Sequence, residues 1–366
     1  MVKLPLYLKL SQVTLGLIGF FYILYIGQEI IVPLIFSLIL AILLNPVVNF
    51  FTKIKINRII AIGLAIVLLI LVIGGILFFI GSQISMFTDS LPELKLKFNE
   101  LLGKGISWFS HNFNVRPYKI NAWIAEQKAA GMHNAGGMIG STITSVSAVL
   151  VVLLIMPVYI FLFLFYKPLL LQFIAKLFES EQHKIVADVL HNTRGLIQNY
   201  LVGLMIEMAI VAAMNSAALM LIGIKYGILL GVIGAILNLI PYIGGIIAIA
   251  LPMIMGLIND DPRSSIFVLI AYMLIQLIDN NFLVPKIVAS KVKVNALVSI
   301  VVVLIGGALW GVAGMFLSIP LAAIIKVIFD RVIYLEPYGF LIGDTMPDIG
   351  KAIFTFNIKK EVKKVE

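Results

Sequence analysis

An uncharged run of about 33 residues, from Tyr226 to Ile258, is the feature that most constrains the fold of this chain. At about 1.5 Å rise per residue, roughly 20 helical residues cross a hydrocarbon core of about 30 Å. The run is therefore too long for one upright helix and too short for two full spans with a turn. Pro241 and Gly244 favour a break near its middle. We predict a hairpin over 226–258 that enters and leaves the membrane on one side, with its tip lining a cavity or buried in protein.

A second segment has a similar pattern of glycine and proline. Gly231–Pro241 can be aligned with Gly311–Pro320, because both begin with Gly-Val and end in Pro, with one residue fewer in the second copy. The second copy lies in its own apolar run, from Asn295 to about Ile325. Two apolar segments interrupted in corresponding places are typical of inverted-repeat transporters. We predict a second hairpin over 296–329 with its break near Ser318–Pro320. The alternative is that Gly-x-x-Gly and a mid-helix Pro are simply common in membrane helices.

The composition is that of a polytopic membrane protein. Mean hydropathy is +1.10, 61% of the residues are hydrophobic and 12% are charged. The net charge of +9 comes from short basic clusters between apolar runs. Retention of basic loops on the cytoplasmic side explains these clusters better than nucleic-acid binding does. The absence of cysteine excludes disulfides and thiolate chemistry. The first apolar run, Leu10–Ile26, has no small-residue cleavage site and is expected to be a retained helix rather than a signal peptide.

The apolar runs predict an all-α polytopic membrane protein with about eight membrane segments, two of which are the opposed re-entrant hairpins. The other spans are expected near 10–27, 31–51, 59–81, 144–166, 200–222 and 264–284. The predicted regions are the N-terminal spans at 1–81, an extracytoplasmic amphipathic region at 82–143, a fourth span with a cytoplasmic helical region at 144–199, a transport core at 200–334 and a cytoplasmic tail at 335–366. Apolar and charged residues alternate over Leu91–Phe109 as in a helix that lies on a membrane surface or on a neighbouring subunit.

Basic residues in the short loops predict the orientation in the membrane. Lys3 and Lys9 precede the first span and Lys53 follows the second, whereas the turn between these spans has no basic residue. Both termini are therefore expected on the cytoplasmic side. If the first hairpin re-enters, Lys291 and its neighbouring lysines lie inside and the acidic turn at 259–261 lies outside. The first hairpin would then enter from outside and the second from inside.

Three stretches together resemble the autoinducer-2 exporter family. They are Asn238-Leu-Ile-Pro-Tyr-Ile-Gly244, the set Gln276, Asp279, Asn281 and Pro285, and Gly306-Gly-Ala-Leu-Trp-Gly311 followed by Gly314 and Pro320-Leu-Ala-Ala323. The resemblance covers most of 144–330. It implies a bacterial inner-membrane exporter or permease with about eight membrane segments that forms a homo-oligomer. The implied substrates differ among members: some transport the quorum signal autoinducer-2, and others exchange sodium for protons. Asp279 stands where the family usually has Glu.

Glu207 is the most exceptional single residue, because it lies in the apolar helix predicted at 200–222. An ionised carboxylate at the centre of a membrane helix costs about 2.5–3.5 kcal/mol on insertion scales. Tyr200, Gly203 and Glu207 share one helix face, with Asn215 near its edge. Glu207 is a candidate for carrying a proton or cation. The alternative is a protonated Glu that joins two helices by a hydrogen bond.

The span at 264–284 carries a polar stripe that consists of Tyr272, Gln276, Asp279 and Asn280. A stripe of this kind is too costly to face lipid, so it must face protein or water. Asp279 lies toward the inner end of the span and has a second, purely structural interpretation. Asn238 and Ser318 precede the two expected breaks, where each could bind a polar solute or a free carbonyl of its own bend.

These residues predict a secondary transporter that exports a small polar solute such as autoinducer-2 by alternating access around the two hairpin tips. The alternatives are a sodium–proton antiporter of the same fold and a passive channel or structural membrane protein. Expected substrate-binding residues are Asn238, Pro241, Tyr242, Gly244, Gln276, Asn281, Ser318 and Pro320; expected ion-coupling residues are Glu207 and Asp279. The four histidines lack metal-ligand spacing, and no P-loop, Gly-x-Ser-x-Gly or His-Glu-x-x-His occurs. The expectation is a non-enzyme without cofactor, metal, nucleic-acid partner or evident ATPase subunit, with the lipid bilayer and a small solute as its partners.

Overall fold

The protein is built from helices throughout the part of the chain that the structure describes. The computed structural model describes residues 5–89, 91–113, 116, 118, 122, 154–240, 244–258, 263–288 and 293–345. The helices are α1 (Leu6–Ile26), α2 (Gln28–Lys53), α3 (Arg58–Asp89), α4 (Leu91–Phe113), α5 (Leu154–Phe165), α6 (Lys167–Leu177), α7 (His183–Ile222), α8 (Gly227–Asn238), α9 (Gly244–Ile258), α10 (Arg263–Ile278), α11 (Ala296–Phe329) and α12 (Glu336–Ile342). A 3-10 turn, η1 (Ser180–Gln182), precedes α7, and a π-helix, η2 (Asp279–Val288), continues α10. The all-α prediction is confirmed for these residues.

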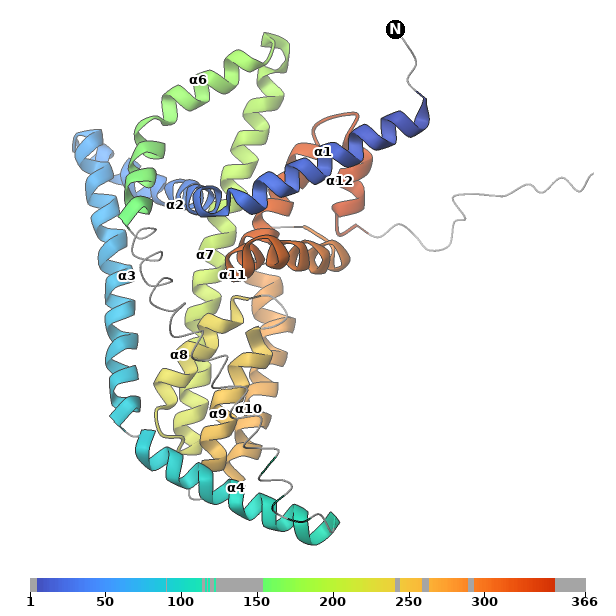
Figure 1. Cartoon of the computed structure of the whole chain (residues 1–366). Helices are drawn as coiled ribbons and strands as arrows, with labels where there is room; N and C mark the ends of the chain where they lie inside the picture. The colour runs from blue at the N-terminus through green and yellow to red at the C-terminus, as the bar shows by residue number, and fades with distance from the viewer. Residues whose placement is uncertain are drawn as a thin grey trace, which may run out of the picture.

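Five of the described helices are long and apolar enough to cross a membrane, and the bent pair α5 and α6 raises the number to six. These five are α2, α3, α7, α10 with η2, and α11. The protein is therefore a membrane protein, whereas the total of eight segments stays a prediction. Two helices extend further than expected: α3 runs to Asp89 and α7 begins at His183. The amphipathic stretch at 91–109 lies in α4, which crosses the end of the bundle at a steep angle to α3 (Figure 1).

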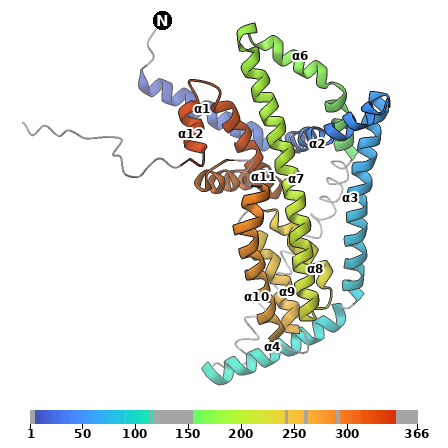
Figure 2. The ribbon, with the colours of Figure 1, turned by 180° about the vertical axis from the view of Figure 1, so that it is seen from behind.

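The first hairpin consists of α8 and α9, which lie beside one half of α7 and α10 (Figures 1 and 2). The end of α7, the start of α8, the end of α9 and the start of α10 all lie at one end of the molecule. The two helices have 12 and 15 residues. At about 1.5 Å per residue they are roughly 18 and 23 Å long, which is less than a hydrocarbon core of about 30 Å. This shape is the one expected of a hairpin that turns back inside the membrane.

The second hairpin lies within α11, which folds back on itself at Trp310 and Gly311. Gly311 has φ +59° and ψ −142°, a backbone conformation that Gly adopts at little cost. Gly306 and Gly314 then face each other so closely that a Cβ on Gly306 would overlap Gly314 O and Ser318 Oγ. Residues eight positions apart in a straight helix would be about 12 Å apart. The two arms therefore pack against each other along small residues.

This turn corrects two expectations. The break was expected near Ser318–Pro320, but Ser318 and Pro320 are buried within the second arm, and Ser318 Oγ donates to Gly314 O over 2.6 Å. The alignment of Gly231 with Gly311 is also wrong as a structural equivalence, because Gly231 lies inside α8 and Gly311 lies at a tip. Pro320 does not mark the turn, because a membrane helix can contain a Pro without turning back.

The open end of the second hairpin is closed by Asn295, which caps α11. Its Oδ1 accepts from Val298 N over 2.9 Å. Its Nδ2 lies 2.7 to 3.1 Å from the carbonyl oxygens of Leu341, Ile342 and Gly343, at the end of α12. Both ends of α11 therefore lie at the same end of the hairpin, and the tip reaches α1, where Trp310 Nε1 donates to Leu24 O over 2.9 Å.

Three clusters of buried apolar residues lie between the helices. One joins α2, α3 and α5 around Ile62 and Ile160. A second joins α2, the first half of α7, η2 and α11 around Ile197 and Leu317. The third joins the second half of α7 to α8, α9 and α10 around Leu219. Because α7 belongs to two clusters, it links the first hairpin to the rest of the bundle.

Labelling of single cysteines tests whether the first hairpin re-enters. In this cysteine-free chain we expect Lys225→Cys and Arg263→Cys, one at each end of the hairpin, to react with an impermeant maleimide from the same side of the membrane. Lys293→Cys should react from the opposite side only. Reaction of Lys225→Cys and Arg263→Cys from opposite sides would show that 226–258 crosses the membrane.

Candidate transport site

The polar stripe of α10 ends where the helix widens into η2. Asp279 is the first residue of this π-helix and is almost completely buried, with 1% of its surface exposed. π-helical segments are rare and are frequent at functional sites. Gly203 of α7 lies against this segment, where an added Cβ would be 2.7 Å from Ile287 O. The close approach of α7 and η2 keeps Asp279 between the two helices and the first hairpin.

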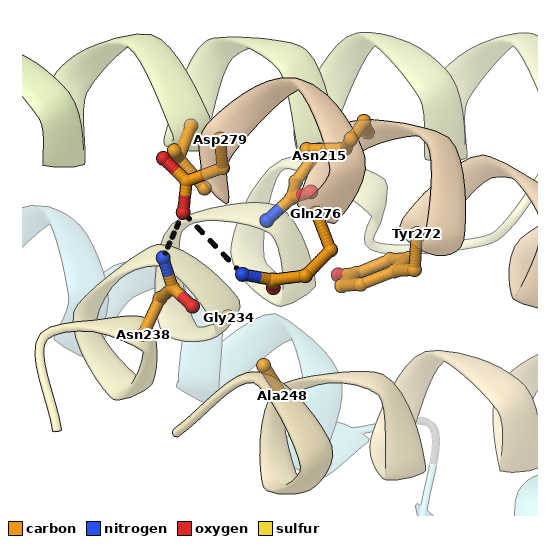
Figure 3. A pocket seen from close by; sticks show the side chains of 9 residues that line it. Asn215, Gly234, Asn238, Ala248, Tyr272, Gln276 and Asp279 are labelled. Carbon is orange, nitrogen blue, oxygen red and sulfur yellow. Dashed lines mark hydrogen bonds between the residues drawn. The ribbon is translucent and has the colours of Figure 1, made fainter. Parts of the chain in front are cut away.

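Two amides hold one oxygen of the Asp279 carboxylate. Asn238 Nδ2, at the end of α8, donates to Asp279 Oδ2 over 2.9 Å. Gln276 Nε2 lies 3.4 Å from the same oxygen and 3.1 Å from Asn280 Oδ1. Figure 3 shows these amides on one side of the carboxylate. A hydrogen bond from the last residue of α8 therefore connects the hairpin tip to the start of the π-helix that continues α10.

A small cavity lies next to this hydrogen bond, between α7, α8, α9 and α10 (Figure 3). It has room for about one water molecule, which is far less than the volume of a sugar-sized solute. Gly234 forms part of its wall: an added Cβ would lie 3.1 Å from the Tyr272 hydroxyl and 3.4 Å from Asn215 Nδ2. The lining residues are Val211, Asn215, Gly234, Asn238, Ala248, Tyr272, Ile275, Gln276 and Asp279.

Three buried oxygens around this cavity have no hydrogen-bond partner among the described residues. They are Asn215 Oδ1, the Tyr272 hydroxyl and Asp279 Oδ1. Each belongs to a side chain that is more than nine-tenths buried. A buried polar atom without a partner is costly, so such atoms in native proteins usually meet water, an ion or a ligand. The cavity therefore presents oxygen atoms and one carboxylate to a small polar or cationic guest.

Glu207 lies outside this cavity but close to it. It is 5% exposed, and its carboxyl is close enough to Asp279 to interact with it electrostatically. Tyr200 lies on the same face of α7 and also interacts with Glu207. The structure therefore places two carboxyls of the membrane core near each other, on two different helices.

The other predicted site residues have varied positions. Asn281 is exposed and donates to Leu277 O over 2.8 Å, so it does not reach the cavity. Gly244 packs against the end of α8, where a Cβ would overlap Leu237 O. Ser318 and Pro320 lie in the second hairpin and do not line the cavity. Pro241 and Tyr242 lie outside the described residues.

Asn215 is the lining residue that the sequence analysis undervalued. It was noted only as a neighbour of the Glu207 face, yet its amide borders the cavity. An amide eight positions after a buried carboxyl, in an apolar helix, is the signal that would have indicated Asn215.

The described residues contain no group of three or more His, Cys, Asp or Glu side chains that could hold a metal ion.

A comparison with protein families places this fold and site in context. The family model described as AI-2E family transporter matches residues 15–333, nearly the whole chain. The chain belongs to the AI-2E transporter family. The match includes both hairpins and every residue that lines the cavity.

Relatives from two bacteria extend along most of the chain. YueF of Bacillus subtilis is 27% identical over 322 residues, which is 83% of this chain and 84% of YueF. The AI-2 transport protein TqsA of Escherichia coli is 24% identical over 328 residues, 87% of this chain and 90% of TqsA. PerM of Escherichia coli is 30% identical over 226 residues, 58% of this chain and 62% of PerM. This chain is therefore similar to YueF and TqsA over most of their length and to PerM over 62% of its length.

Substitution of Asn238 tests the contact between hairpin tip and carboxylate. Asn238→Ala removes the shorter of the two hydrogen bonds to Asp279 Oδ2, and loss of a bond to a charged group costs about 1.5–3 kcal/mol. We expect the initial rate of transport in proteoliposomes to fall about tenfold or more. Asn281→Ala is the matched control, because it also removes an amide from this region but leaves the cavity intact. Equal rates for the two variants would contradict a role of Asn238 in transport.

Proposed function

We propose that this chain is a secondary transporter that exports a small polar solute, autoinducer-2 or a similar signalling molecule. It would work by alternating access at the cavity between α7, the first hairpin and α10. The observation that carries the proposal is the hydrogen bond from Asn238 to Asp279, which joins a hairpin tip to the start of a π-helix. Interrupted helices that meet at a polar site are the binding sites of many secondary transporters.

The small volume of the cavity supports a carrier rather than an open channel. A space for about one water molecule cannot contain an organic solute, so the described conformation is a closed one. Transport then requires the first hairpin and α10 to separate near Asp279 and Gln276. The cluster of α2, α3 and α5 would serve as the scaffold. In this proposal the protein lies in a bacterial inner membrane with both termini in the cytoplasm.

The solute is proposed from the chemistry of the lining and from one relative. The cavity offers amides, a phenol and a carboxylate, which suit a small molecule rich in hydroxyl groups. TqsA, whose name describes AI-2 transport, is similar over most of both chains. Autoinducer-2 is therefore the solute with which to test the protein first.

Sodium–proton exchange is the second candidate, and the unpartnered oxygens favour it. Asn215 Oδ1, the Tyr272 hydroxyl and Asp279 Oδ1 resemble the oxygen ligands that hard cations prefer. The cavity has room for about one water molecule, and a dehydrated Na⁺ is small enough to fit into such a space. In this case Asp279 would bind the cation, and Glu207 beside it would exchange the proton.

Flux measurements on purified protein in liposomes test both candidates. One set of vesicles is loaded with autoinducer-2, and the other contains a pH-sensitive dye and receives a sodium gradient. We expect saturable efflux of autoinducer-2 that a pH gradient accelerates. Proton movement driven by sodium in the absence of solute would favour the second candidate. No flux above that of empty liposomes in either set would contradict a transport function for these substrates.

Substitution of Glu207 tests proton coupling. Glu207→Gln keeps the shape of a protonated Glu but cannot release a proton, so we expect downhill exchange of solute to persist while acceleration by a pH gradient is lost. The measurement is the ratio of efflux rates with and without the gradient. If the gradient still accelerates efflux in this variant as in the wild type, Glu207 serves only to pack α7 against its neighbours.

A further inference from the structure

The end of α2, the start of α3 and the junction of α5 and α6 come together at one side of the molecule (Figures 1 and 2). A second, larger pocket lies between them. It has a volume of about 520 Å³, is open to the surface and is separate from the transport site. Its walls are of two kinds. Val48, Ile56 and Leu164 are apolar, whereas Asn45, Arg58 and Lys167 are polar or charged.

Two basic side chains, Arg58 and Lys167, line the pocket, and no carboxylate in the described part of the chain lines it. Lys167 Nζ donates to Asn45 Oδ1 over 3.0 Å, and Arg58 Nη2 donates to Leu164 O over 3.0 Å. Neither residue forms an ion pair with an Asp or Glu among the described residues. Lys167 is the first residue after the bend that ends α5, and Arg58 and Arg194 lie near it. Lys167 and Arg58 therefore have neutral partners only among the described residues.

Unpartnered donors border the same place. Asn45 is 6% exposed and lines the pocket, and its Nδ2 has no hydrogen-bond partner among the described residues. The Lys167 ammonium donates to Asn45 Oδ1, which fixes the orientation of the amide and leaves Nδ2 available. The Nε of the nearby Arg194 is also buried without a described partner. A guest must therefore supply acceptors and negative charge, the opposite of what the transport site requires.

The position of the pocket indicates which anion fits. It lies at the ends of apolar helices, on the side of the molecule that holds Lys53 and Lys55, where lipid headgroups are expected. Phe50 and Leu171, which are 61% and 42% exposed, provide apolar surface beside it. Arg and Lys together recognise the oxygens of a phosphate, and basic pockets between membrane helices suit anionic headgroups.

We propose that this pocket binds the phosphate group of an anionic phospholipid, with Arg58, Lys167 and Asn45 as its ligands. The phosphate would accept hydrogen bonds from Asn45 Nδ2 and from the two cations, and the acyl chains would extend along the apolar surface beside the pocket. A bound lipid would connect α2 and α3 to the α5–α6 junction.

Thermal unfolding of the full-length protein in detergent tests the proposal. The probes are phosphatidylglycerol, phosphatidylcholine and inorganic phosphate, added separately. We expect phosphatidylglycerol to raise the unfolding midpoint of the wild type by several degrees and phosphatidylcholine to leave it unchanged. A rise with inorganic phosphate equal to that with phosphatidylglycerol would support the phosphate site but assign it to a soluble ligand. No rise with either phosphate-bearing anion would overturn the proposal.

Two variants and one control locate the effect. Lys167→Gln removes a charge but keeps a donor for Asn45 Oδ1, and Asn45→Asp supplies a carboxylate that pairs with Lys167 and repels phosphate. Both should reduce binding of phosphatidylglycerol, measured by native mass spectrometry, about tenfold or more. Lys176→Gln removes the same charge from an exposed position of α6 outside the pocket and should bind as the wild type does. Unchanged binding in folded Asn45→Asp protein would overturn the proposal even if Lys167→Gln failed to fold.

Discussion

The hydrogen bond from Asn238 to Asp279 is the interaction on which the arrangement of α7, the first hairpin and α10 depends. A carboxylate in the membrane interior is stable only if polar groups surround it, and here the amides of Asn238 and Gln276 occupy one of its oxygens. The other oxygen has no described partner and faces a space for about one water molecule. The hairpin tip, the start of the π-helix and the polar cavity thus meet at Asp279, and together they surround its carboxylate with polar groups that lipid cannot supply.

Small residues allow the backbones to come close enough for this arrangement. Gly203 lets α7 approach the carbonyl of Ile287 in η2, and Gly234 keeps the cavity open beneath Tyr272 and Asn215. In the second hairpin, Gly306 and Gly314 allow the arms of α11 to touch. Membrane helices gain little from burying apolar side chains against each other, so close packing and interhelical hydrogen bonds must hold them together.

The first hairpin could be predicted from the sequence because length alone excludes the alternatives: 33 uncharged residues fit neither one span nor two. The polar stripe likewise indicated Gln276 and Asp279, which do line the cavity. The turn of the second hairpin could not be located in this way, because Gly311 adopts its positive φ without any proline nearby. Asn281 was predicted from the family resemblance and not from the polar stripe; in the structure it donates to Leu277 O and does not line the cavity. Two residues apart on a helix, Asp279 and Asn281 face different sides, so a motif that names both does not place both at one site.

The central claim is that the cavity at Asp279 opens alternately to the two sides of the membrane. The accessibility of a residue in the cavity wall tests this claim most directly. Ala248 lines the cavity and is 5% exposed, so Ala248→Cys in this cysteine-free chain reports when the cavity opens. In vesicles with one protein orientation, we expect an impermeant maleimide to label this cysteine slowly from either side. Autoinducer-2 or sodium, whichever is transported, should slow the labelling. Labelling from one side only, at a rate that neither substrate changes, would contradict alternating access at this cavity.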